Sequence, residues 1–246
     1  MTNTYKIAER IIEITSVYED IHTLCKDYLF PANPDFSVVT TQEDIEFERE
    51  KSAKEDEAKD MPVRQFSDGY LETLAVYRKI SEKMPDYDTI LFHGSCIAVD
   101  GVGYLFTASS GTGKSTHARL WRELLGDRAV MVNDDKPLIR LTDDGAIVYG
   151  TPWDGKHHLS SNISVPLKAL CVLMRFEKNI INPITPSQAY ATLMQQTYRP
   201  ADNMAMIKTL SLIDKLSSSV SLWMLGCNME IEAAKIAYEA MRGQEA

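Results

Sequence analysis

The feature that most constrains this chain is the run A-S-S-G-T-G-K-S-T at residues 108–116. It fits the phosphate-loop pattern G-x-x-x-x-G-K-[ST], except that Ala108 stands where the first glycine is usual. The apolar residues before it, 104–108, predict a strand, and residues 114–125 continue with apolar positions at helical spacing. A strand, a glycine-rich loop and a helix in this order predict an α/β fold.

This loop predicts a site for the phosphates of a nucleotide. Gly111 and Gly113 permit backbone torsions that turn successive N–H groups inward, and the helix N-terminus adds the positive end of its dipole. Lys114 is expected to contact the β- and γ-phosphates, and the hydroxyl of Ser115 is expected to bind Mg²⁺. The residues expected to bind the nucleotide are Ser109, Ser110, Gly111, Thr112, Gly113, Lys114, Ser115 and Thr116.

A second pattern, V-M-V-N-D-D at residues 130–135, places two carboxylates after a predicted buried strand. Asp134 lies nineteen residues after Ser115, where a phosphate-loop protein commonly holds its metal through an acidic residue. One carboxylate of the pair can bind Mg²⁺, and the other can accept a proton from a hydroxyl. A turn rich in Asn and Asp, without a catalytic role, is the alternative interpretation.

His93 lies in F-H-G-S, twenty-one residues before Lys114. A lone histidine is more often structural than catalytic, so its spacing alone does not assign it a role.

Taken together, the histidine, the loop and the following N-D-D-K resemble the catalytic core of the HPr serine kinase/phosphorylase family. The resemblance covers residues 89–140 and implies an α/β P-loop kinase core with a mixed sheet, of the kind that family shares with phosphoenolpyruvate carboxykinases. It implies that His93 lies at the active site and that Lys114 contacts the transferred phosphoryl group. Asp135 would be the base and Asp134 a metal or water ligand, and the order within the pair stays open.

The chain departs from that family after the aspartate pair. HPr kinases carry an E-I-R-G stretch whose glutamate helps to hold the metal, whereas this chain reads Y-G-T-P-W-D-G-K-H-H at residues 149–158. Asp154 is the residue available to replace that glutamate. Shorter relatives of this core occur beside peptide-modification systems, where some phosphorylate a serine of a precursor peptide, so the resemblance implies a serine-bearing protein or peptide as partner.

Two further segments carry candidate residues. Residues 151–158 include Lys156 and a His157–His158 pair; no Cys or acidic spacing completes a zinc site, and a substrate-facing loop and a plain surface loop both remain open. Arg199, in Q-Q-T-Y-R-P, is either a phosphate clamp or an ordinary arginine after a helix.

The preferred hypothesis is a kinase that uses ATP and Mg²⁺ to phosphorylate a hydroxyl. The alternative is a P-loop ATPase or nucleotide-binding switch without a phosphoryl acceptor. A guanine-specific switch is disfavoured because the chain has no N-K-x-D, and a decarboxylating carboxykinase is disfavoured because such enzymes are longer and need further arginines.

The sequence suggests two domains: a small α/β subdomain at residues 1–88 and a kinase-like domain at 89–246. Strands are expected at 6–14, 36–40, 89–99, 104–108, 129–132, 137–141, 146–149, 167–174 and 220–225. Helices are expected at 16–29 with Ser16 as N-cap, and at 68–84, 114–125, 187–196, 203–216 and 229–241.

Charge narrows the classes of partner. The net charge is −9, and residues 42–60 contribute −5 of it through nine acids and four bases, which is typical of a solvated helix or connector. Such acidity disfavours nucleic-acid binding and association with anionic membranes. The region after the loop is locally basic, with Lys114, His117, Arg119 and Arg122.

Cysteine spacing and hydropathy indicate the cellular compartment in which the protein is expected. The four cysteines are 56 or more residues apart, which indicates a reducing compartment, and no apolar run approaches the ~20 residues of a membrane span. We therefore expect a cytoplasmic protein. The family resemblance implies that it can form a homo-oligomer.

Overall fold

The computed structural model describes residues 1–155 and 157–243. The chain divides into two compact units, Met1–Lys83 and Met84–Ala246. None of the helices in the described residues has the length and apolar character that crossing a bilayer requires.

The first unit contains a three-stranded sheet in the order β1-β2-β3, formed by β1 (Thr2–Ile7), β2 (Arg10–Thr15) and β3 (Phe36–Val39). β1 and β2 are antiparallel, and β2 and β3 are parallel. The single strand expected at 6–14 is wrong, because Ala8 and Glu9 turn the chain with φ of 48° and 63°. Neither residue type favours such torsions, so the turn leaves no sequence signal.

Three helices accompany this sheet: α1 (Asp20–Leu24), α2 (Gln42–Glu57) and α3 (Asp68–Lys83), with a 3₁₀ turn η1 at Lys26–Tyr28. The helix expected at 16–29 is shorter, and Ser16 does not cap it. The Ser16 hydroxyl instead donates to the carbonyl of Tyr18 at 2.7 Å. The acidic segment forms α2, whose start is fixed by a capping box between Thr41 and Asp44.

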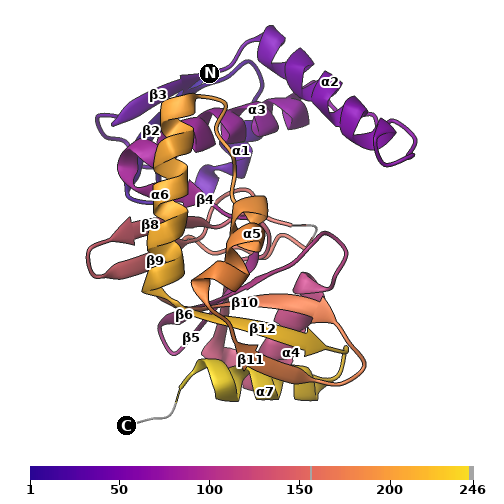
Figure 1. The fold of residues 1–246 in the computed structure, drawn as a ribbon. Coiled ribbons are helices and arrows are strands. Elements are labelled where there is room, and N and C mark those ends of the chain that lie inside the picture. The colour runs from indigo at the N-terminus through magenta and orange to yellow at the C-terminus, as the bar shows by residue number, and fades with distance from the viewer. Residues whose placement is uncertain (156, 244–246) are drawn as a thin grey trace. The chain divides into compact units, whose positions relative to one another are not determined.

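In the described part of the second unit, nine strands form one mixed sheet in the order β4-β8-β9-β10-β6-β5-β7, with β12 between β10 and β11. The bounds are β4 (Thr89–Leu91), β5 (Ser95–Val99), β6 (Val102–Thr107), β7 (Ala129–Asn133), β8 (Leu138–Thr142), β9 (Gly145–Tyr149), β10 (Ser164–Arg175), β11 (Ile180–Pro183) and β12 (Ser221–Cys227). β10 pairs antiparallel with β9 at its start and parallel with β6 and β12 beyond (Figure 1). The prediction of an α/β fold with a mixed sheet is confirmed.

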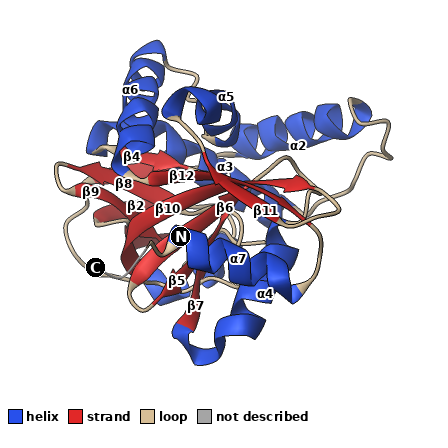
Figure 2. Cartoon of the chain, turned by 60° about the horizontal axis from the view of Figure 1, so that its bottom comes forward, coloured by secondary structure: helices blue, strands red, loops and turns tan. Residues whose placement is uncertain are grey.

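Helices cover both faces of this sheet (Figure 2). α4 (Lys114–Leu125) and α7 (Ile231–Met241) pack on one face around the buried Trp121, and α5 (Pro186–Gln196) and α6 (Asn203–Ser219) pack on the other around Leu193 and Leu216. The 3₁₀ turns are η2 (Met84–Tyr87) and η3 (Gly126–Arg128). Each of these four helices lies within a few residues of its predicted range.

One expected strand of this unit, 89–99, is wrong because the chain leaves the ladder between β4 and β5. Here the backbone N–H groups of Phe92, His93 and Gly94 donate to Pro137, Gln196 and Asp135 carbonyls at 3.0, 2.7 and 3.0 Å. His93 therefore lies in the connection between β4 and β5 and not within one continuous strand. The short edge strand β11 was not expected from the sequence.

Candidate functional site

The glycine-rich loop connects the end of β6 to the start of α4. Gly111 and Gly113 have φ of +77° and +124°, values that side chains other than glycine rarely adopt. A Cβ at either position would meet nothing within 4 Å, so the backbone torsion, and not lack of space, requires glycine there. The loop thus lies at the carboxyl end of a strand, where open α/β sheets bind ligands.

Lys114 is the first residue of α4 and curls back over the loop. Its Nζ donates to the carbonyl of Ala108 at 3.1 Å. Burial lowers the pKa of Lys114, and the negative charge of Asp135 partly opposes this shift. The ammonium group is therefore held close to the loop by a carbonyl oxygen, which phosphate oxygens can replace.

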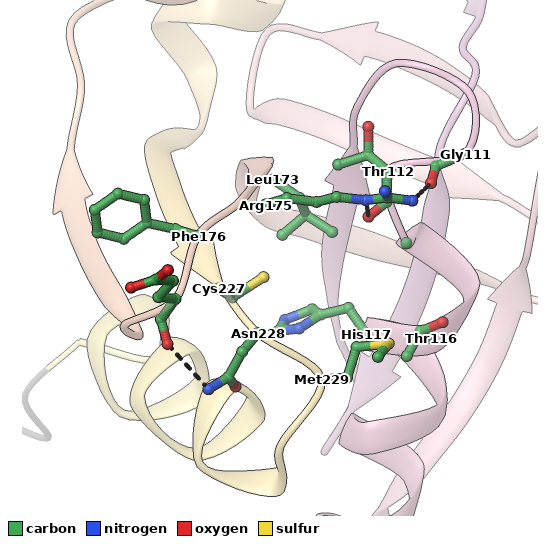
Figure 3. A pocket seen from close by; sticks show the side chains of 12 residues that line it. Gly111, Thr112, Thr116, His117, Leu173, Arg175, Phe176, Cys227, Asn228 and Met229 are labelled. Carbon is green, nitrogen blue, oxygen red and sulfur yellow. Dashed lines mark hydrogen bonds between the residues drawn. The ribbon is translucent and has the colours of Figure 1, made fainter.

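Arg175, the last residue of β10, adds a second positive charge to the loop. Its Nη2 donates to the carbonyl of Gly111, and its Nε donates to that of Thr112 at 3.3 Å (Figure 3). We did not predict this residue from the sequence. The signal that could have identified Arg175 is its position. It is a charged residue at the carboxyl end of β10, and β10 runs parallel to β6, the strand that precedes the loop.

Asn133 ends β7 and orients the two aspartates that follow it. Its side chain is buried; Oδ1 accepts from the backbone N–H of Asp135 at 2.8 Å and of Lys136 at 2.6 Å. Nδ2 donates to Thr151 Oγ1 at 3.1 Å. The Asx turn that we gave as the alternative interpretation is present, and it directs Asp134 and Asp135 into different surroundings.

Asp134 is buried, and one of its oxygens has no partner. Oδ1 accepts from the backbone N–H of Gly155 at 2.5 Å, whereas Oδ2 makes no hydrogen bond within the described part of the chain. Burial raises the pKa of Asp134, and the charges of Asp154 and Asp135 raise it further. An unsatisfied buried carboxylate oxygen costs free energy unless a proton or a cation binds it.

Asp134 and Ser115 line the same pocket, which has a volume of about 340 Å³. A carboxylate oxygen and a hydroxyl are the oxygen ligands that Mg²⁺ takes at phosphate sites, where phosphates and water complete the octahedron. These residues therefore fit a magnesium ion. The other residues that line this pocket are Thr116, Ala118, Arg119, Arg122, Met131, His157 and Leu159.

Asp135 faces nitrogen atoms of the protein instead. Its Oδ1 lies 3.1 Å from Nε2 of His93, and its Oδ2 lies 3.2 Å from Nζ of Lys136. Burial alone would raise the pKa of Asp135, but the hydrogen bond from His93 and the charge of Lys136 outweigh it and lower the pKa to about 2. Asp135 is therefore an ionised carboxylate at neutral pH.

His93 is held from its other side by Gln196, at the end of α5. Its Nδ1 lies 2.8 Å from Oε1 of Gln196. The sequence predicted His93 but not Gln196, because the two residues are 103 positions apart and no local pattern links them. The structure thus brings His93 and Asp135 together and supplies a partner that fixes the ring.

The other candidate residues are distributed as follows. Ser109 and Ser110 are exposed on the loop, and Thr116 lines both of the pockets beside it. Asp154 accepts from His158 at 3.0 Å and from Ser160 at 3.2 Å, so other residues occupy both of its oxygens. Lys156 lies outside the described residues. Arg199 is exposed and is not among the described residues that line either pocket.

The expectation that His117 adds positive charge near the loop is wrong. Its side chain is buried in the first turn of α4, and burial lowers the pKa of His117 to about 4. The ring is neutral at physiological pH, so the basic character of this region comes from Lys114, Arg119, Arg122 and Arg175.

Comparison with known families identifies a match over more than half of the chain. The family described as SynChlorMet cassette protein ScmC matches residues 64–211, which include His93, the loop, the aspartate pair and Gln196. It is not the HPr serine kinase family that residues 89–140 resemble. A search of curated proteins finds no match.

Among solved structures, the Hpr(Ser) kinase/phosphatase from Coxiella burnetii is similar to this chain, with 14% sequence identity. The similarity covers 52% of this chain and 97% of that chain, with a TM-score of 0.28. A TM-score of this size does not establish a common fold.

Proposed function

This chain belongs to the ScmC family of SynChlorMet cassette proteins, and we propose that it is an ATP- and Mg²⁺-dependent kinase of the HPr kinase-like type. It transfers the γ-phosphoryl group to a hydroxyl, that of a serine in a protein or peptide. One observation carries the proposal. The phosphate loop lies beside two adjacent carboxylates, one with an unsatisfied buried oxygen and one hydrogen-bonded to a histidine.

The loop and its two cations account for nucleotide binding. The backbone N–H groups at the start of α4 and the helix dipole attract the triphosphate. Lys114 and Arg175 now donate to loop carbonyls and would exchange these acceptors for phosphate oxygens, which are charged and bind more strongly.

Ser115 and Asp134 are the residues that would hold Mg²⁺. When bound, the ion neutralises charge on the β- and γ-phosphates. The pocket they share supports this assignment, since a cation would satisfy Asp134 Oδ2 and offset the repulsion from Asp154 and Asp135.

Asp135 and His93 are the residues that would act on the acceptor. The serine Oγ attacks the γ-phosphorus, the bond between that phosphorus and the β–γ bridging oxygen breaks, and the serine proton passes to the carboxylate of Asp135. A carboxylate with a pKa of about 2 is a weak base, so its main contribution is to orient the hydroxyl. Loose phosphoryl-transfer transition states need little proton removal before the bond to phosphorus forms.

Phosphoryl transfer can be tested without knowing the natural acceptor. The purified chain is incubated with Mg²⁺ and ATP labelled in the γ-phosphoryl group, together with a peptide library that has serine fixed at its centre and no serine at its degenerate positions. The matched control library has alanine there. The proposal expects label in the serine library only.

Two results would contradict the proposed kinase activity. Release of labelled phosphate without peptide labelling would favour the ATPase or switch, and equal labelling of both libraries would exclude serine as the acceptor. The Lys114→Ala variant controls for a contaminating kinase, because its labelling should fall with its affinity for ATP.

A further inference from the structure

A second and larger pocket is lined by residues of the loop itself. Its volume is about 590 Å³, within the ~300–1,000 Å³ typical of ligand pockets. Loop residues form one end of it, and the ends of β10 and β12 form the other (Figure 3). The lining residues are Gly111, Thr112, Gly113, Thr116, His117, Leu173, Arg175, Phe176, Glu177, Cys227, Asn228 and Met229.

The two pockets beside the loop differ in chemistry. Both linings mix polar and apolar residues, but the smaller one contains the carboxylate of Asp134, whereas the larger one presents the bulky apolar side chains of Leu173, Phe176 and Met229. An apolar surface next to a phosphate site suits the flat, largely apolar faces of a nucleobase.

His117 provides the one buried polar side chain in this lining whose hydrogen bonding is incomplete within the described residues. It is 2% exposed, and its Nε2 accepts from the indole N–H of Trp121 at 3.0 Å. Indole nitrogen can only donate, so Nε2 carries no proton and the single proton of the neutral ring lies on Nδ1. Nδ1 has no hydrogen-bond partner in the described part of the chain.

Packing holds this ring in place. The ring of Phe106 contacts His117 edge-on, with centroids 4.7 Å apart, and the Trp121 bond fixes the opposite edge. In Figure 3 the imidazole extends from α4 toward Asn228 and Cys227. A buried donor held without an acceptor destabilises a fold, and such groups in native proteins call for a functional explanation.

We propose that His117 is a specificity-determining residue, which donates a hydrogen bond from Nδ1 to an acceptor atom of a nucleobase bound in the larger pocket. This inference rests on the proposed function, because it requires a nucleoside triphosphate on the loop. The phosphates lie on Gly111–Gly113, and the base occupies the apolar end of the pocket that these same residues line. His117 then contacts the base, while the loop contacts only the phosphates.

Two variants of His117 separate its two nitrogens. His117→Gln places an acceptor near the position of Nε2, so the Trp121 bond can persist while the donor at Nδ1 is lost. His117→Asn places an amide nitrogen near the position of Nδ1, so the donor persists while the Trp121 bond is lost. The asparagine variant is expected to have the lower melting temperature of the two.

The measurement compares the dissociation constants of ATP and of inorganic tripolyphosphate, both in excess Mg²⁺. Wild type is expected to bind ATP more tightly than tripolyphosphate. His117→Gln should reduce that preference about tenfold, the effect of one buried hydrogen bond, and leave tripolyphosphate affinity unchanged. His117→Asn should keep most of the preference despite its lower stability.

A measurement on wild type does not depend on how the variants fold. The Nδ1 proton resonance of His117 should move downfield with ATP and stay in place with tripolyphosphate. An unchanged preference in His117→Gln, or an unmoved resonance with ATP bound, overturns the inference and leaves the proposed function intact. Failure of wild type to bind either ligand overturns both.

Discussion

Asp134 and Asp135 are neighbours in the sequence, yet they occupy opposite electrostatic surroundings. Asp134 is buried beside two other carboxylates and has a raised pKa, whereas Asp135 lies between His93 and Lys136 and has a pKa lowered to about 2. One carboxylate has an oxygen without a partner in the described residues, and both oxygens of the other lie beside nitrogen atoms of His93 and Lys136. Adjacent residues of the same type are thereby prepared for different roles.

The difference also assigns an order to the pair that the sequence left open. A carboxylate with an unsatisfied buried oxygen suits a metal, and a partly exposed carboxylate that touches a histidine suits an incoming hydroxyl. We therefore propose Asp134 as the metal ligand and Asp135 as the base.

Asp135→Asn should reduce phosphoryl transfer by about 10²-fold, the low end of the contribution of a positioned base, because a carboxylate with a pKa of about 2 is a weak base. The affinity for ATP should stay within about twofold of wild type, because Asp135 is not expected to contact the nucleotide. Single-turnover transfer to the serine library and a parallel ATP titration measure the two quantities. Transfer at the wild-type rate would show that the base lies elsewhere.

Asp134→Asn should raise the Mg²⁺ concentration that supports half-maximal ATP binding by at least about tenfold, since it removes the charged ligand. The readout is a Mg²⁺ titration at fixed ATP. The matched control is Asp154→Asn, whose side-chain oxygens are occupied by His158 and Ser160. If the two variants behave alike, the magnesium assignment to Asp134 is wrong.

The two carboxylates should affect stability against pH with opposite signs. The pKa of Asp135 is lower in the folded state than the ~3.9 of a free aspartate, so its stabilisation is complete above about pH 4 and lost as the pH falls toward 2. The pKa of Asp134 is raised, so its ionisation destabilises the fold as the pH rises above about 4.

Melting temperatures without Mg²⁺ at pH 3 and pH 7 check this contrast. Asp134→Asn should melt higher than wild type at pH 7, by about 2–4 °C for each 1 kcal/mol gained, with a smaller difference at pH 3. Asp135→Asn should melt lower than wild type at pH 7, and its deficit should also shrink at pH 3. Shifts of the same sign in both variants would contradict the contrast.

Gln196→Leu should have the smallest effect, because Gln196 acts only through His93. Removing its Oε1 frees the imidazole to rotate, and we expect a fall in the transfer rate of about three- to tenfold with unchanged ATP affinity. Gln196→Glu keeps a side-chain oxygen beside Nδ1 and should recover most of the rate. If the leucine variant has full activity, His93 needs no such positioning.

The sequence was most informative where one local pattern determines local structure. The glycine-rich turn between β6 and α4, and α4 itself, follow from residues 104–125, because glycine torsions and short-range periodicity decide them. The hairpin turn at Ala8 and Glu9 was missed because neither residue type signals a left-handed backbone.

Contacts between residues far apart in the sequence account for the parts of the site that could not be predicted. Gln196 reaches His93 across 103 residues, and Arg175 reaches Gly111 across 64. His117 was misread as a basic residue because its burial depends on Phe106 and Trp121, which the sequence alone does not place around it. Sheet order, and not local propensity, brings these residues together.

The proposed kinase activity requires that the loop binds a nucleotide, and a calorimetric titration of the full chain with ATP and Mg²⁺ measures this binding. We expect saturable binding at one site, and an affinity about 10–100-fold lower in Lys114→Ala, because a hydrogen bond between charged groups is lost. Absence of ATP binding by the folded wild-type chain, or equal affinity in Lys114→Ala, would contradict it.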